Sequence, residues 1–152
     1  DANGNGGQLV FLTETSGGTT TERLRITAAG SVGIGSAVPK GDVDIGEQFS
    51  IKTTTTAVSS TAATSIDTLA IATYRSSRFQ VQITQGTDYQ SADLMVIHDG
   101  TTASIIEYGS IATNNMLASF TSTISGSNLL LQVNMGSSSS ATVKVVRYGI
   151  SV

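Results

Sequence analysis

His98 is the only histidine of the chain and the side chain best suited to acid–base chemistry near neutral pH. A Ser-His-Asp hydrolase would use it as the base, between a nucleophilic serine and an orienting carboxylate. The neighbouring Asp99 would point to the opposite face of a continuing strand or sit in a turn, and no G-x-S-x-G elbow is present. We therefore expect His98 to end a strand and to be satisfied by a hydrogen bond in a turn.

The carboxylates could supply the acid pair of a glycosidase, because the chain holds 11 Asp and Glu residues. Those of residues 48–152 fall mostly at or beside expected turns, where aspartate is favoured because it bonds to its own backbone. They are Asp67, Asp88, Asp93, Asp99 and Glu107. No catalytic residue is predicted from them, and we do not expect an enzyme.

Two acidic segments could hold a cation. Asp1–Gly6 partly matches the start of a calcium loop, but position 12 of that loop is Leu12 instead of glutamate. Asp42–Glu47 is a weaker candidate that is better explained as an acidic linker. The chain has no cysteine, and the glycines of Gly30–Gly35 lack the spacing of a phosphate loop. We predict neither a metal nor a cofactor.

Aromatic side chains could bind a sugar by stacking on its apolar face. The four tyrosines are Tyr74, Tyr89, Tyr108 and Tyr148. Tyr89 lies between Asp88 and Gln90 in an expected loop, and these three residues form a candidate ligand-binding cluster for a glycan. The alternative is that the tyrosines pack at sheet edges or at seams between subunits.

The composition excludes several classes of partner. Charged residues make up 12% of the chain, against roughly 25% in an average soluble domain. The net charge is −3, and the eight Lys and Arg residues are scattered, so nucleic-acid binding is not expected. No apolar run approaches the ~20 residues that span a bilayer, so membrane insertion is not expected. The chain begins at Asp1 instead of Met, which favours a fragment of a longer protein.

The elements that must position these residues are β-strands, since 21 Ser, 22 Thr and 16 Gly suit strands and turns better than helices. Residues 1–47 are glycine-rich, with expected strands at 7–12, 22–27 and 32–35. They hold too few large apolar side chains to bury a core alone. We expect further copies of the chain to supply it, through an interface of Leu24, Ile26, Val32 and Ile34.

Residues 48–152 show regular strands separated by turns. The expected strands are 49–59, 65–74, 78–85, 93–98, 104–108, 117–124, 128–134 and 141–148. Phe79, Val81 and Ile83 alternate with polar residues, and the odd-numbered positions of 129–135 do the same, which predicts half-buried strands. Leu94–Ile97 is apolar throughout and predicts a strand buried on both faces. Asp99-Gly100 predicts a two-residue hairpin. The fold class is all-β, a short front segment followed by an antiparallel, jelly-roll-like sandwich.

Residues 22–39, with the sequence ERLRITAAGSVGIGSAVP, resemble a recurring segment of phage tail fibres. That segment pairs an E-R-x-R-I strand with a turn and a V-G-I-G step, ahead of a terminal domain. The usual threonine or serine pair before the proline is replaced here by Ser36-Ala37-Val38.

The later part resembles a β-domain of structural proteins from contractile-tailed phages of marine cyanobacteria. The matching stretches are TYRS at 73–76, RFQVQI at 78–83, VIHDGT at 96–101 and EYG at 107–109. Both resemblances imply an intertwined homotrimer in the virion, outside cells, that contacts other virion proteins and possesses no catalytic set. A host surface polysaccharide is a further expected partner. A lectin-like carbohydrate-binding module and a tailspike depolymerase stay open as alternatives.

Overall fold

A computed structural model describes residues 6–152. The segment Asp1–Gly6, which partly matches the start of a calcium loop, therefore lies almost wholly outside the described residues. The chain divides into two compact units. The first runs up to Lys52 and includes Ser151, and the second holds Thr53–Ile150 and Val152. Across the described range, nothing helical has the length and hydropathy to span a bilayer.

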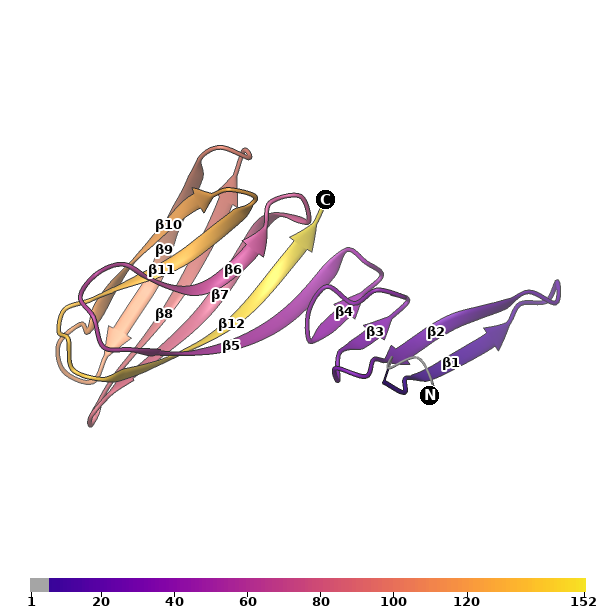
Figure 1. The fold of residues 1–152 in the computed structure, drawn as a ribbon, viewed down its shortest axis with the longest axis horizontal. Coiled ribbons are helices and arrows are strands. Elements are labelled where there is room, and N and C mark those ends of the chain that lie inside the picture. The colour runs from indigo at the N-terminus through magenta and orange to yellow at the C-terminus, as the bar shows by residue number, and fades with distance from the viewer. Residues whose placement is uncertain (1–5) are drawn as a thin grey trace. The chain divides into compact units, whose positions relative to one another are not determined.

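The first unit is a thin sheet in the order β1-β2-β3-β4-β5 (Figure 1). Its strands are β1 (Leu9–Glu14), β2 (Thr20–Ile26), β3 (Val32–Ile34), β4 (Val43–Ile45) and the start of β5 (Phe49–Val58). The pair β3–β4 is parallel, and β1–β2, β2–β3 and β4–β5 are antiparallel. The prediction that Asp42–Glu47 is a linker is therefore wrong, because this segment contains the strand β4.

The second unit is a β-sandwich of two sheets, which confirms the all-β fold class. One sheet has the order β5-β12-β7-β8-β9 and the other β10-β11-β6. The strands are β6 (Thr64–Ala70), β7 (Tyr74–Gln85), β8 (Asp88–His98), β9 (Ala103–Ala112), β10 (Ala118–Ser125), β11 (Asn128–Met135) and β12 (Ala141–Ser151). Figure 1 shows the smaller sheet lying over the larger one.

The core of the second unit lies between these sheets. Phe79, Val81 and Ile83 of β7 are fully buried, and Leu131 and Val133 of β11 face them from the other sheet. Both alternation patterns are thus confirmed. A strand with one face on a core repeats every two residues, so its inward side chains can be read from the sequence.

Two predictions for β8 and its turn are wrong. The run Leu94–Ile97 is not buried on both faces, because Met95 is 38% and Ile97 54% exposed while Leu94 and Val96 are buried. Within residues 6–152, no third layer lies above the outer face of β8. Asp99-Gly100 is not a two-residue hairpin, because His98 pairs with Ala103 and four residues form the loop.

Candidate functional site

Ten apolar side chains share one face of the first unit. Directly paired residues of neighbouring strands point to the same side of a sheet. The register pairs Leu24 with Ile34 and Ile26 with Val32, so the four predicted interface residues lie on one face. The pairing of β1, β4 and β5 adds six more. This open apolar face comprises Leu9, Phe11, Leu24, Ile26, Val32, Ile34, Val43, Ile45, Phe49 and Ile51.

The open apolar face is poorly covered by its own chain. Ile26 is 37%, Ile34 45% and Phe11 49% exposed, and Leu24 and Val32 are half-buried. The first buried apolar side chain among the described residues is Val58, which belongs to the second unit. The described part of the first unit therefore has no apolar interior of its own.

Over β3, β4 and β5 the opposite face of the same sheet is polar and covered. Asp44 and Ser50 are fully buried there. A Cβ on Gly33 would lie 2.2 Å from the carbonyl oxygen of Ser36, so only glycine allows the chain to fold over this face. The Asp44 carboxylate accepts hydrogen bonds from the backbone N–H groups of Lys40 (2.9 Å) and Glu47 (3.1 Å). Asp44 thus organises two loops, and residues 6–152 contain no cluster of three metal-ligating side chains.

The candidate cluster around Tyr89 lies at the start of β8 instead of in a loop. The Tyr89 side chain is 46% exposed, and Asp88 accepts a hydrogen bond from the amide of Asn114. Gln90 is only 2% exposed. Its amide donates to Ser110 and to the carbonyl of Ala118 (3.0 Å each), and it accepts from the backbone N–H of Leu117 at 2.6 Å. Gln90 therefore holds the start of β10 in place from inside.

Three shallow hollows lie on the outer face of β12, β7, β8 and β9. One of about 360 Å³ is lined by Arg78, Gln80, Asp93 and Tyr148. A second, of about 330 Å³, lies over Ser91, Asp93, Gly109 and Ile111, and a third, of about 420 Å³, is lined by Gln82, Tyr89, Ser91, Ile111 and Thr113. Shared lining residues make them one continuous depression, the outer groove. No sequence motif marks it, because its residues come from four strands.

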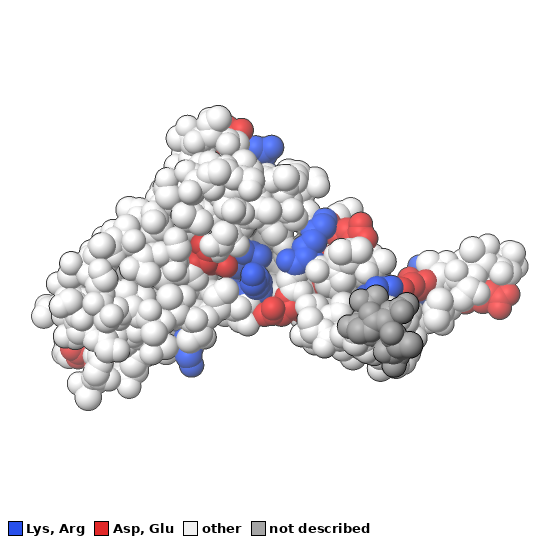
Figure 2. All heavy atoms as spheres, viewed as in Figure 1, with Lys and Arg blue, Asp and Glu red and all other residues white. Residues whose placement is uncertain are grey.

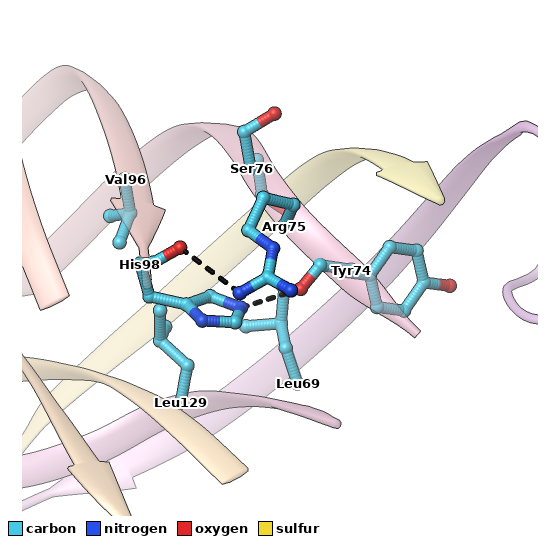
Figure 3. Close-up of a pocket in the computed structure, with 8 residues that line it drawn as sticks. Leu69, Tyr74, Arg75, Ser76, Val96, His98 and Leu129 are labelled. Atoms are coloured by element: carbon cyan, nitrogen blue, oxygen red, sulfur yellow. Dashed lines mark hydrogen bonds between the residues drawn. The ribbon is translucent and has the colours of Figure 1, made fainter. Parts of the chain in front are cut away.

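The surroundings of His98 do not suit acid–base catalysis. Figure 3 shows its imidazole beside the guanidinium of Arg75 and joined to the backbone oxygen of Tyr74. The ring is buried, and its Nε2 lies 2.6 Å from the carbonyl oxygen of Tyr74, so its partner is another strand instead of the expected turn. The cavity beside it measures about 10 Å³, the size of one water molecule, and cannot admit a substrate.

The candidate carboxylates of the second unit are mostly engaged in contacts within the chain. Asp67 lies within β6, not at a turn, and forms a buried ion pair with Arg147 at 2.8 Å. Asp93 pairs with Arg78 at 3.3 Å on the outer face. Glu107 is exposed on β9. Charged side chains are sparse on the face seen in Figure 2.

Asp99 closes the turn between β8 and β9 and makes stability depend on pH. Its Oδ1 accepts hydrogen bonds from the backbone N–H groups of Thr102 (2.7 Å) and Thr101 (2.8 Å) and from the Thr101 hydroxyl. These bonds, that of Thr102 foremost, lower the pKa of Asp99 from 3.8 to about 2. Because the folded pKa is the lower one, the stabilisation is present above pH 3.8 and is lost as the pH falls towards 2.

We expect Asp99→Ala to lower the melting temperature at pH 7 and to flatten its decline between pH 4 and pH 2. The measurement is thermal unfolding followed by circular dichroism across that range. Glu107→Ala controls for the loss of one negative charge on β9. An Asp99→Ala protein whose acid profile matches that of the wild type contradicts this role of the turn.

The comparisons with known proteins concern the fold alone. No protein-family model matches the chain, and no curated protein sequence matches it. The crystal structure of the Acinetobacter baumannii phage AM24 tailspike protein is similar to 70% of the chain, at 8% identity and a TM-score of 0.47. The Acinetobacter phage vB_ApiP_P1 tailspike protein is similar to 64%, at 22% identity and a TM-score of 0.38. The aligned part covers 27% and 20% of these two proteins, so the chain spans about a quarter of their length.

Proposed function

We propose that this chain is a structural component of a phage virion, part of a tail fibre or similar appendage that assembles as a homotrimer. The observation that carries the proposal is the sheet of the first unit, whose apolar face is open although its polar face over β3, β4 and β5 is covered. A globular unit buries its apolar side, because each fully buried large apolar side chain contributes about 1.5–3 kcal/mol. The open apolar face therefore calls for a partner surface.

Further copies of the chain are the partner that suits this face best. Closed symmetry lets identical short strands cover one another and removes exposed sheet edges. We choose three copies because residues 22–39 resemble the fibre segment described above. Leu24, Ile26, Val32 and Ile34 form the centre of the proposed trimer interface, and the other six residues of the open apolar face extend it.

The second unit would then present its surface to a partner outside the virion. A host surface polysaccharide is the proposed ligand, with the exposed Tyr89 and the half-buried Asp88 as its contacts and the buried Gln90 beneath them. Other virion proteins are the second class of proposed partner, and the resemblance to proteins of cyanobacterial contractile-tailed phages suits such a role. We propose no catalysis, since His98 is enclosed and Asp67 and Asp93 are held in ion pairs.

The test of assembly is the mass of the intact chain in solution. Light scattering after size exclusion is expected to give three times the chain mass of 15.6 kDa, unchanged on dilution through the micromolar range. Slow subunit exchange is expected as well, since intertwined β-structure unfolds slowly. A monomeric mass at micromolar concentration contradicts the proposal and leaves the carbohydrate-binding module as the better assignment.

A further inference from the structure

We propose that the outer groove of the second unit binds an uncharged polysaccharide and that Gly109 keeps the centre of this groove open. The inference rests on the proposed display function of the second unit. It extends the ligand contact from the cluster of Asp88, Tyr89 and Gln90 to a larger surface, which shares the exposed Tyr89 with that cluster. Three features of the groove support this site: the unpaired polar groups of its floor, its balanced charges and the open space at its centre.

The floor of the groove offers unpaired donors and acceptors. Gln80 and Gln82 of β7 both point outward, and neither side chain hydrogen-bonds another described residue. The hydroxyl of Ser91 on β8 is free of such bonds in the same way. Each amide presents two N–H donors and a carbonyl acceptor, and the serine hydroxyl can both donate and accept a hydrogen bond. Neighbouring sugar hydroxyls also donate and accept, so this floor matches their chemistry.

The charges of the groove compensate each other. Arg78 and Asp93 face each other at 3.3 Å, with 59% and 42% of their side chains exposed. An anionic sugar would meet the carboxylate of Asp93 and a cationic one the guanidinium of Arg78. Hydroxyl groups, in contrast, can bond to both without separating them. This balance favours an uncharged chain over an acidic one.

Aromatic rings stand at two places along the groove. Tyr148 lines the hollow that contains Arg78, and Tyr89 lines the hollow that contains Gln82. The strands β12 and β8 that carry them flank β7, and neighbouring strands lie about 4.8 Å apart. Two rings separated by a polar floor fit an extended oligosaccharide better than a single sugar, because apolar sugar faces can pack on each ring.

Gly109 gives the groove its open centre. It lies in β9 opposite Asp93, next to the irregularity in the β8–β9 register. A Cβ built on Gly109 meets nothing within 4 Å, so a side chain here would project into the hollow without a clash. Glycine weakens a strand relative to β-branched residues. A ligand that occupies this space would account for glycine at a position that the fold itself does not require to be glycine.

The variant Gly109→Val tests the site without threatening the fold. We expect its melting temperature to equal or exceed that of the wild type, because valine favours a strand. We expect its binding to immobilised neutral bacterial polysaccharides to fall by about tenfold or more. Ser104→Val is the matched control, since it adds the same side chain to the exposed face of β9 outside the groove, and it is expected to retain binding.

The assay uses the intact chain on an array of neutral and acidic bacterial surface polysaccharides. Binding of neutral members that is lost in Gly109→Val and in the pair Gln80→Ala/Gln82→Ala supports the site. Preference for acidic members, wild-type binding by Gly109→Val, or no binding to any member overturns it. The mass of each variant is measured in parallel. A three-chain mass without binding contradicts the groove alone, whereas a monomeric mass contradicts the proposed assembly.

Discussion

Asp67→Ala is expected to destabilise the protein by about 3–5 kcal/mol, because it leaves the buried cation of Arg147 without its partner. Asp67 of β6 and Arg147 of β12 belong to different sheets of the second unit and are bridged at 2.8 Å, with 2% and 3% of their side chains exposed. Without Asp67, the guanidinium retains the Tyr74 ring at 4.8 Å and a long bond to the carbonyl of Thr68 at 3.4 Å. Neither contact replaces a carboxylate.

Thermal unfolding followed by circular dichroism measures this effect, with an expected fall in melting temperature on the order of 10 °C. The double variant Asp67→Leu/Arg147→Met is expected to recover most of the loss, because replacing both members of a buried ion pair by apolar side chains is often neutral or stabilising. The Nε of Arg147 is buried without a hydrogen bond to any described residue, so part of its desolvation cost is uncompensated in the wild type. A single variant within about 1 kcal/mol of the wild type contradicts the role given to this pair.

The sequence could predict the strands because a half-buried sheet repeats every two residues. Phe79, Val81 and Ile83 show that pattern and are fully buried. The same rule does not extend to Met95 and Ile97, which are apolar but exposed. An apolar run indicates a strand, while the covering of its second face depends on whether another layer lies above it.

Pairing between distant segments could not be predicted. Arg147 and Asp67 are 80 residues apart, and nothing local marks them as partners. The three-residue strand β4 has no strong local signal, because its pairing with β3 and β5 defines it more than its own composition does. The outer groove has no local signal for the same reason, since four strands contribute to it. The sequence predicts Tyr89 as a candidate contact in a loop, whereas the residue lies in β8.

The four residues predicted as the trimer interface belong to a larger apolar pattern. The V-x-I spacing of Val32 and Ile34 recurs at Val43 and Ile45, and Phe49 and Ile51 follow the same alternation. This recurrence could have extended the predicted interface from the sequence alone. It could not have shown that the polar face over β3, β4 and β5 is already covered, which depends on the chain folding back at Gly33.

Ile34→Asp is expected to prevent assembly of the proposed trimer. Ile34 lies in the middle of the open apolar face, paired with Leu24 on one side and Ile45 on the other. In a three-fold assembly each copy would contribute one carboxylate to the apolar interface. Each would lose its hydration without gaining a partner, at a cost of several kcal/mol. Light scattering is expected to show monomers or aggregates where the wild type shows three chains.

Val38→Asp is the matched control for Ile34→Asp, because it places the same charge on an apolar residue of the first unit that is 72% exposed and outside the open apolar face. It is expected to keep the three-chain mass. The milder Ile34→Ala guards against a variant that simply fails to fold, since it should assemble with a lower melting temperature that depends on protein concentration. If Ile34→Asp keeps the wild-type mass, this face does not join the subunits. The strands β2 and β3 would then need another explanation for apolar side chains that their own chain leaves uncovered.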